Sequence, residues 1–214
     1  DTLTGNASND FLNGGTGTDK LIETRDAELF VVTDTNVLID LTTGAVGDEE
    51  FDTLVSLEIA TLIGGAGANS FDVTGWTANN ITVDGAGGTD TVNVQVPLPA
   101  LPAPAGGTVT LTTTSVTFTG SSAIINLASI EQAIIKGTDR DEILDAAGFV
   151  GATWLQGMGG DDVLKSGQGG LIQIMDGGEG SDQFVFVQNA VLESTFLIGG
   201  TDADGTDVDT LDFS

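Results

Sequence analysis

Short runs of apolar residues alternate along this chain with clusters of glycine and aspartate. The apolar runs are rich in Val, Leu, Ile and Thr, which favour strands, whereas glycine beside Asp favours tight turns. No long stretch has the 3.6-residue period of a helix, and only residues 48–57 allow a short helical turn. The pattern therefore predicts an all-β protein in which strands and turns follow one another.

The turns repeat a nine-residue pattern, G-G-x-G-x-D-x-U-x, in which U is a large apolar residue. Two copies match it at every fixed position, residues 14–22 and 177–185. Five more depart from it at one or more positions: 5–13, 64–72, 85–93, 137–145 and 157–165. Such a fixed period is typical of a solenoid.

The spacing of these copies indicates the shape of the coil. Only residues 5–22 hold two copies back to back, and elsewhere the glycine turns mostly begin about 20 residues apart. One glycine turn per full coil predicts a right-handed parallel β-helix or β-roll solenoid with about 17–22 residues per coil. We expect its Asp residues to line one edge.

A longer repeat of about 73 residues lies on top of this pattern. Residues 56–76 align with residues 129–149, which places Trp76 opposite Phe149 and predicts a core or stacking role for Trp76. We expect one elongated solenoid over 1–214. Its parts are a β-roll-like pair at 1–22, duplicated coils at 30–96 and 109–166, a Pro-rich segment at 97–107, and C-terminal coils at 167–214.

The Pro-rich segment interrupts the pattern. Its four prolines cannot join a central ladder, so it is either a loop that leaves the solenoid or a linker between two half-domains. The coil pattern resumes in the same form beyond it, which favours the loop.

The nonapeptide resembles the repeats-in-toxin family, also called the hemolysin-type calcium-binding repeats, which form a parallel β-roll or β-helix. The resemblance implies calcium ligands at the Asp position: Asp10, Asp19, Asp90, Asp162 and Asp182. Four weaker candidates follow from the imperfect copies: Asp52, Asn69, Asp141 and Glu142. The alternative for each is an ordinary turn residue, since Asp and Asn favour turns without any metal.

The motif has a chemical rationale. We expect glycine at its first, second and fourth positions because these allow positive φ and a tight turn. Calcium takes six to eight oxygen ligands, and coils stacked about 4.8 Å apart can offer it oxygens from two turns. The U residue, two places after the Asp, is expected to point into the core.

The C-terminal stretch is also acidic. Four aspartates stand close together there: Asp202, Asp204, Asp207 and Asp209. Their DADGTD core resembles an acidic calcium loop, although the bidentate Glu and flanking helices of an EF-hand are missing. The alternative is a disordered acidic tail.

Composition narrows the possible ligands. The chain has 32 acidic and 5 basic residues, a net charge of −27, which argues against a nucleic-acid partner and favours cations. It lacks Cys and His, so a metal would be bound by oxygen, as hard cations such as calcium are. A solvated acidic surface of the salt-adapted kind is the alternative.

We therefore expect a calcium-binding structural or adhesive module of a larger secreted or cell-surface bacterial protein, and not an enzyme. Its expected partners are calcium ions, neighbouring domains of the larger chain, and an extracellular glycan or surface. No apolar run approaches the length of a membrane span.

Two rival functions remain open. A β-helix enzyme that modifies polysaccharides would use the many carboxylates, with Arg25 or Arg140 beside calcium. A glycan- or ice-binding surface would use the Thr-rich residues 108–120, for which strand propensity is the simpler explanation.

Overall fold

The computed structural model describes residues 1–5, 8–25, 29–33, 36–40, 49–76, 80–96, 107–169, 172–187, 194–200 and 207–213. Across these ranges the chain forms strands and no helix, so the all-β prediction is confirmed. The helical turn considered for residues 48–57 is wrong, because Glu49–Val55 forms a strand. None of the described segments is a helix able to cross a membrane. Residues 97–106 of the Pro-rich segment lie outside the described ranges.

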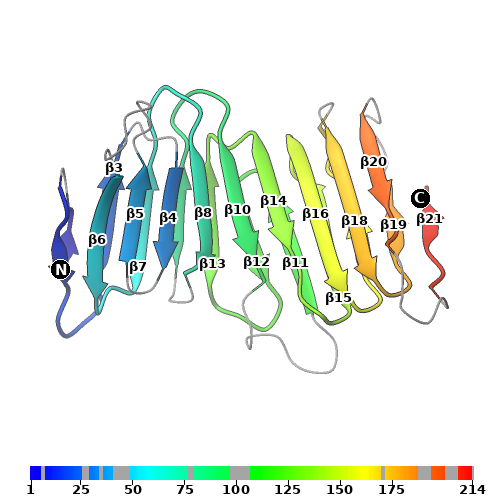
Figure 1. The fold of residues 1–214 in the computed structure, drawn as a ribbon, viewed down its shortest axis with the longest axis horizontal. Coiled ribbons are helices and arrows are strands. Elements are labelled where there is room, and N and C mark those ends of the chain that lie inside the picture. The colour runs from blue at the N-terminus through cyan, green and yellow to red at the C-terminus, as the bar shows by residue number, and fades with distance from the viewer. Residues whose placement is uncertain are drawn as a thin grey trace. The chain divides into compact units, whose positions relative to one another are not determined.

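Figure 1 labels the strands, which divide into two compact units. Unit 1 comprises Asp1–Asn93 and Ala123–Ile130, and unit 2 comprises Val94–Ser122 and Glu131–Ser214. Most neighbouring strands in both units run parallel, as the solenoid prediction requires.

In unit 1 the strand orders are β1-β3-β7-β9-β13 and β2-β6-β5-β4-β8-β10. Strands of the first sheet are β1 (Thr2–Leu3), β3 (Lys20–Thr24), β7 (Ile59–Ile63), β9 (Ile81–Asp84) and β13 (Ile124–Ala128). Strands of the second sheet are β2 (Phe11–Asn13), β4 (Leu29–Thr33), β5 (Asn36–Asp40), β6 (Glu49–Val55), β8 (Ser70–Gly75) and the first three residues of β10 (Thr91–Gln95).

In unit 2 the strand orders are β12-β11-β15-β17-β19-β21 and β14-β16-β18-β20. Strands of the first sheet are β11 (Gly107–Thr112), β12 (Ser115–Phe118), β15 (Glu142–Gly148), β17 (Val163–Lys165), β19 (Gln183–Val185) and β21 (Thr210–Asp212). Strands of the second sheet are β14 (Gln132–Lys136), β16 (Ala152–Gly159), β18 (Gln173–Glu179) and β20 (Thr195–Ile198).

Successive strands from β14 to β21 alternate between the two sheets of unit 2, which is compatible with the predicted solenoid. Within a sheet, Leu144 pairs with Leu164 and Leu164 with Phe184, so neighbouring strands are about 20 residues apart in the chain. This agrees with the coil length that the glycine spacing predicts.

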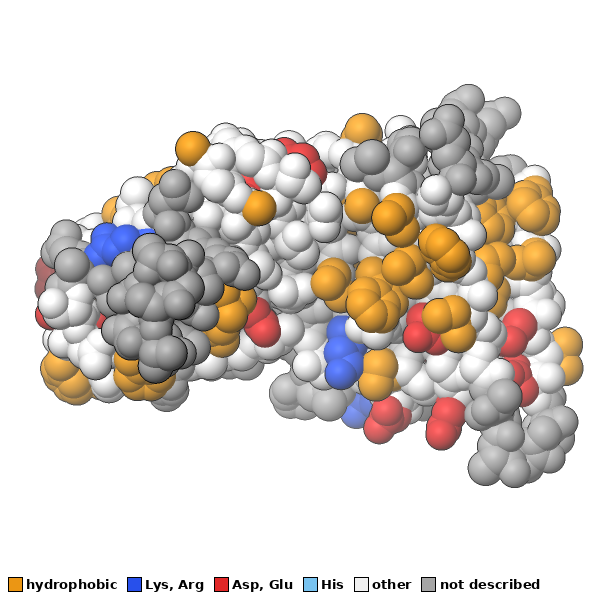
Figure 2. Space-filling model, turned by 45° about the horizontal axis from the view of Figure 1, so that its top comes forward, with side chains coloured by type: hydrophobic (Ala, Val, Ile, Leu, Met, Phe, Trp, Pro, Cys, Tyr) orange, Lys and Arg blue, Asp and Glu red, His pale blue; other side chains and the backbone are white. Residues whose placement is uncertain are grey.

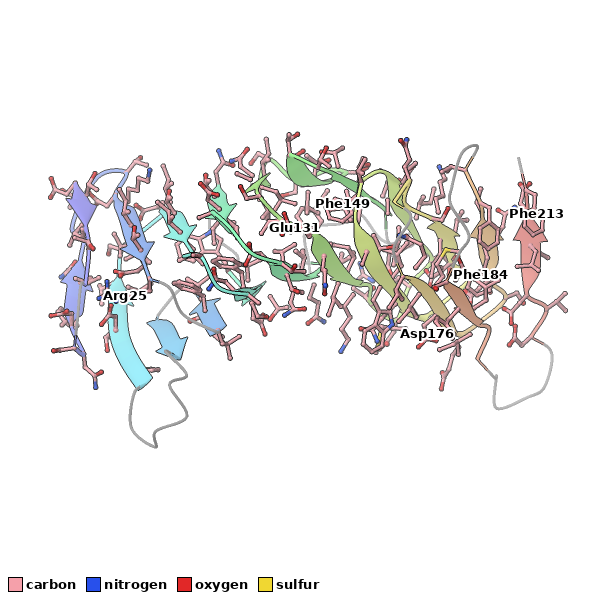
Figure 3. All side chains as sticks on the ribbon, turned by 90° about the horizontal axis from the view of Figure 1, so that it is seen from above. Arg25, Glu131, Phe149, Asp176, Phe184 and Phe213 are labelled. Carbon is pink, nitrogen blue, oxygen red and sulfur yellow. The ribbon has the colours of Figure 1, made fainter. Side chains whose placement is uncertain are left out.

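Burial alternates along most strands and explains why the U positions are apolar. Leu21, Val92, Leu164 and Phe184 all stand two places after the Asp position, and all are buried. The alternation follows from the two-residue period of a strand, which turns every second side chain inward. Phe184 lies in the core of unit 2, whereas Phe213 at the last strand is largely exposed (Figure 3).

Both units contain antiparallel strand pairs that the sequence did not predict. In unit 1, β5 pairs antiparallel with both β4 and β6, and in unit 2, β11 pairs antiparallel with β12. Gly75 lies against Thr33 in the first unit and Gly148 against Thr112 in the second, each where the strand register shifts. The Thr-rich residues 108–120 thus form one hairpin, so T-x-T does not recur there on successive coils.

Two pairs of residues that the 73-residue repeat aligns have equivalent local geometry. Ser56 and Ser129 both adopt positive φ, at 53° and 50°, although neither is glycine. Trp76 donates its backbone N–H to the carbonyl of Val73 as Phe149 does to Ala146, and both aromatic side chains are buried. The core role predicted for Trp76 is confirmed.

Candidate metal-binding turns

In unit 2, four acidic residues begin four neighbouring strands of one sheet. Glu142 is the first residue of β15, while Asp162, Asp182 and Asp209 directly precede β17, β19 and β21. The first three are buried, each with only 1% of its surface exposed, and Asp209 on the last strand is exposed. Their position follows from the repeat, which places the acid at the end of each turn.

A chain of backbone hydrogen bonds links these four residues. The N–H of Glu142 donates to Asp162 Oδ1 at 2.7 Å, and the N–H of Asp162 donates to Asp182 Oδ1 at 2.9 Å. The N–H of Asp182 in turn donates to Asp209 Oδ1 at 3.0 Å. Each side chain thus satisfies the backbone of the preceding turn, and we call this arrangement the acidic ladder.

The second carboxylate oxygens of the ladder are not satisfied in this way. Oδ2 of Asp162 and Oδ2 of Asp182 are buried and have no hydrogen-bond partner among the described residues. Oδ2 of Asp19 in unit 1 is in the same situation. A buried charged oxygen without a partner is costly, so each of these atoms calls for a proton or a cation.

The first glycine of each repeat makes room for the carboxylate. A Cβ atom at Gly137 would lie 2.8 Å from Glu142 Oε2 and 2.5 Å from the carbonyl oxygen of Gly157. A Cβ atom at Gly177 would lie 2.5 Å from Asp182 Cγ. Real Cβ atoms essentially never approach this closely, so any side chain at these positions would displace the acid.

This result corrects one prediction about the glycines. Positive φ occurs at the second and fourth positions of the repeat, as in Gly178 at 99° and Gly180 at 118°, but not at the first position. The first glycine is therefore required by space and not by backbone conformation. The same space brings a carboxylate oxygen of one turn near a carbonyl oxygen of the next.

In unit 1 the corresponding residues form shorter rows. The N–H of Asn69 donates to Asp90 Oδ1 at 2.7 Å, and Asn69 Oδ1 itself accepts the N–H of Gly65. On another pair of strands the N–H of Asp10 donates to Asp52 Oδ1 at 2.8 Å. Four of the predicted residues are thus joined in pairs.

Asp19 belongs to a different edge from these two pairs. Asp10 precedes β2 in one sheet of unit 1, whereas Asp19 precedes β3 in the other, so the prediction of a single Asp-lined edge is wrong. Residues 5–22 hold two nonapeptides back to back, so each copy covers half a coil and the two copies lead into strands of different sheets. The N–H of Asp19 donates to Glu58 Oε2, and its own Oδ1 accepts the terminal ammonium of Asp1.

Sequence reasoning missed two buried or half-buried acids in unit 1. Glu23 is fully buried and accepts the N–H of Gly5 through Oε1, and Glu58 accepts the N–H of Asp19. Neither fits the nonapeptide. Glu23 could have been predicted to point inward, because it stands on β3 two places after the buried Leu21.

Asp141 lies in a separate, exposed row on unit 2. Its Oδ1 accepts the N–H of Asp161, and Asp161 Oδ1 accepts the N–H of Ser181. In the C-terminal acidic stretch, Asp207 and Asp209 are described, whereas Asp202 and Asp204 lie outside the described residues.

Burial and neighbouring acids change the proton affinity of the ladder. Burial raises the pKa of Asp162 to about 8, with Glu142 and Asp182 adding to the rise and the N–H of Glu142 opposing it. Burial likewise raises the pKa of Asp182 to about 7, reinforced by Asp209. The pKa of Glu142 is raised for the same first reason. At neutral pH the metal-free ladder therefore retains protons that free carboxylates lose.

The atoms that could bind a metal at the acidic ladder are of the type that a hard cation prefers. Every side-chain atom offered by the ladder is oxygen, and carbonyl oxygens of the next turn lie nearby, as calcium prefers. No three acidic side chains of the described residues converge to form a ready-made metal site. A calcium ion at Asp162 and Asp182 would therefore complete its shell with turn carbonyls and water.

Comparison with known proteins adds no evidence for or against a calcium site. Neither a scan against protein-family models nor a search of curated proteins found a match. The resemblance to hemolysin-type repeats therefore depends on the nonapeptide and the turns that carry it.

Proposed function

We propose that this chain is a calcium-binding structural module of a larger secreted or cell-surface bacterial protein. Its strands close into a right-handed parallel solenoid, and calcium between stacked turns stabilises the fold. The observation that carries this proposal is the acidic ladder, in which buried carboxylates follow one another and their Oδ2 atoms at Asp162 and Asp182 lack partners.

Electrostatics explains why the ladder needs a counter-charge. Two carboxylates about 5 Å apart repel by roughly 3 kcal/mol at an effective dielectric constant of about 20. Asp162 faces such neighbours on both sides, Glu142 and Asp182. A bound cation supplies the attraction that cancels this repulsion, and its binding free energy then adds to the free energy of folding.

The burial of the same side chains supports a structural role over a catalytic one. Asp162 and Asp182 are almost completely buried, and their Oδ1 atoms are engaged by backbone N–H groups. A substrate cannot reach them without opening the turn. Carboxylates in this setting stabilise the stacking of coils.

Calcium dependence also fits a protein that folds outside the cell. In the cytosol, where free calcium is scarce, charge repulsion along the ladder and the entropy of the glycine turns oppose folding. Outside, calcium is abundant and stabilises the folded chain by mass action. Secretion in an unfolded form and folding on arrival follow from this coupling.

A calcium titration of metal-stripped protein tests the proposal. We expect β-type circular dichroism and the free energy of unfolding to rise together as ions bind, with bound calcium counted by equilibrium dialysis. Magnesium, which prefers octahedral sites and holds its waters, should stabilise the chain much less. A chain that is fully folded without metal and binds no calcium would overturn the proposal.

A further inference from the structure

An apolar row crosses the outer face of one sheet of unit 2. Ile134, Trp154, Ile174 and Phe196 are register partners on β14, β16, β18 and β20. All four take the outward position of the two-residue alternation, so their side chains point away from the core. Figure 2 shows hydrophobic side chains gathered on this face.

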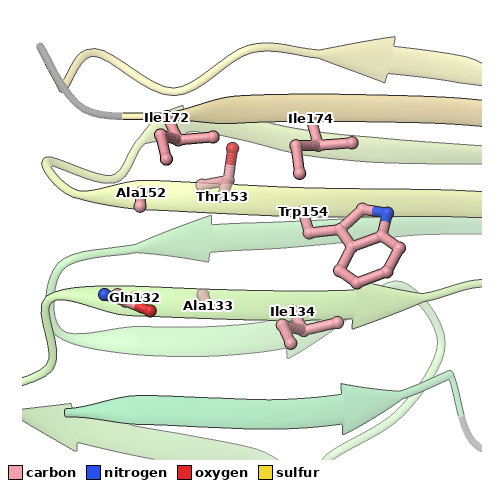
Figure 4. Close-up of a pocket in the computed structure, with 8 residues that line it drawn as sticks. All are labelled: Gln132, Ala133, Ile134, Ala152, Thr153, Trp154, Ile172 and Ile174. Carbon is pink, nitrogen blue, oxygen red and sulfur yellow. The ribbon is translucent and has the colours of Figure 1, made fainter. Parts of the chain in front are cut away.

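The row is wide enough to bind a macromolecule. Trp154, Phe196 and three neighbours, Met158, Ile172 and Ile198, are between 37% and 59% exposed. If a large apolar side chain presents about 200 Å² when fully exposed, the patch is on the order of 500 Å². Trp154 and its neighbours Ile134 and Ile174 line a hollow of about 210 Å³ (Figure 4). Patches of this size on a single chain are often interfaces.

Charged residues of both signs flank the row in a fixed order. Lys136, Gln156 and Asp176 are register partners two places farther along β14, β16 and β18. Neither Lys136 nor Asp176 forms an ion pair with any described residue, although both are half-buried. Burial raises the pKa of Asp176, as expected for a carboxyl without a basic partner.

We propose that this face is the interface of a symmetric dimer of the chain, with the two-fold axis parallel to the strands and passing through β16. That axis places β14 of one protomer over β18 of its partner. Lys136 then meets the partner's Asp176, Ile134 meets the partner's Ile174, and Trp154 meets its own counterpart at the axis. The reciprocal contacts form at the same time, as an isologous interface requires.

Charge complementarity favours a second copy as the occupant. The order Lys136, Gln156, Asp176 is complementary to itself under this rotation, whereas a neutral glycan would gain nothing from it. The apolar patch with its polar flank approaches the roughly 800 Å² per partner of a standard interface. The net charge of −27 on each chain opposes association, so the dimer should tighten as salt screens that repulsion.

Sedimentation equilibrium of the full chain in calcium buffer, from micromolar to several hundred micromolar protein, tests the proposal. We expect a reversible dimer that Trp154→Glu weakens at least about 100-fold, since the substituted side chains face each other at the axis. The matched control is Phe11→Glu, which puts the same charge on an exposed aromatic position of unit 1 and should leave the dimer unchanged. Circular dichroism of each variant verifies the fold.

A charge exchange tests the orientation. Lys136→Glu and Asp176→Lys should each weaken the dimer about tenfold, and the double variant should restore it because the pair is merely reversed. A wild-type monomer at every concentration, a dimer indifferent to Trp154→Glu, or a double variant no tighter than the single ones overturns the proposal. If the chain is monomeric and neutral oligosaccharides shift the tryptophan fluorescence of the wild type but not of Trp154→Glu, the face binds glycan instead. Because all variants are compared as folded protein in calcium, failure here leaves the calcium proposal untouched.

Discussion

The two units use the same turn with different side chains. In unit 2 the acidic ladder runs through Glu142, Asp162 and Asp182, all buried acids. In unit 1 the buried Asn69 takes the place that Glu142 has in unit 2, and its Oδ1 accepts the N–H of Gly65 as Glu142 Oε2 accepts the N–H of Thr138. A neutral amide can therefore accept this hydrogen bond of the turn as a carboxylate does. The hydrogen bond is what the fold requires, and the charge in unit 2 needs a separate explanation, for which calcium is our candidate.

The largest expected effect concerns the space that both units reserve for the acid. Gly157→Ala places a Cβ atom 3.0 Å from Asp162 Cγ and closer still to its Oδ2, so the turn must open. We expect a loss of at least about 3 kcal/mol in the free energy of unfolding, measured by urea denaturation in calcium.

Gly159→Ala is the matched control in the same turn. Its nearest neighbour would lie at 3.7 Å and its φ is not positive, so it should change stability by less than about 0.5 kcal/mol. Equal losses for the two variants would show that the first glycine is not reserved for the carboxylate.

The next effect isolates the charge of unit 2. Asp162→Asn with Asp182→Asn gives this unit the amide that Asn69 provides in unit 1. The folded pKa values of about 8 and about 7 exceed the ordinary 3.8, so the stability that these two groups contribute without metal is full below about pH 4 and is lost as pH rises through 7 and 8. The double variant should lose this dependence.

Thermal unfolding in chelator across that pH range measures the difference. Near pH 8 we expect the double variant to melt at least about 5 °C above the wild type, because it lacks the two buried carboxylates that ionise there. A parallel decline of both proteins with pH would instead assign the dependence to the overall acidity of the chain.

The reverse exchange gives unit 1 a carboxylate at the position where it has an amide. Asn69→Asp places a second carboxylate beside Asp90, and in chelator at neutral pH we expect a loss of about 1–3 kcal/mol, most of it recovered in calcium. Asn93→Asp, half-buried on the outer side of β10, is the control and should cost little. Recovery that is no greater for Asn69→Asp than for this control would contradict the comparison.

The smallest effect belongs to the ion pair between Lys165 and Asp145 in unit 2. Both side chains are partly exposed and 3.0 Å apart, so Lys165→Met should change stability by less than about 1 kcal/mol. A larger loss on urea denaturation would mean that this surface pair contributes as much as the buried ladder.

The sequence predicted the strands and the inward U residues because alternation and turn chemistry are local. Leu164 and Phe184 are buried as the nonapeptide requires. It did not predict the antiparallel pairs β4–β5, β5–β6 and β11–β12, because an alternating strand looks the same whether its neighbour runs parallel or antiparallel.

The candidate site was predicted in part. The repeat predicted that Asp162 and Asp182 align on successive coils, but not their burial or their contacts with backbone N–H groups. Their role as calcium ligands stays a prediction. The spacing of the repeats in the sequence predicts which residues stack. The direction of a carboxylate within a turn depends instead on the three-dimensional path of the next coil. For the same reason the role of the first glycine was assigned to φ and not to space.

Calcium-induced stabilisation of three proteins tests the central claim most directly. We would measure the gain in the free energy of unfolding on adding calcium for the wild type, for Asp162→Asn with Asp182→Asn, and for the exposed control Glu179→Gln. The account predicts equal gains for wild type and control, and a gain smaller by at least about 1.4 kcal/mol for the ladder variant. Equal gains in all three, or none in the wild type, would contradict it.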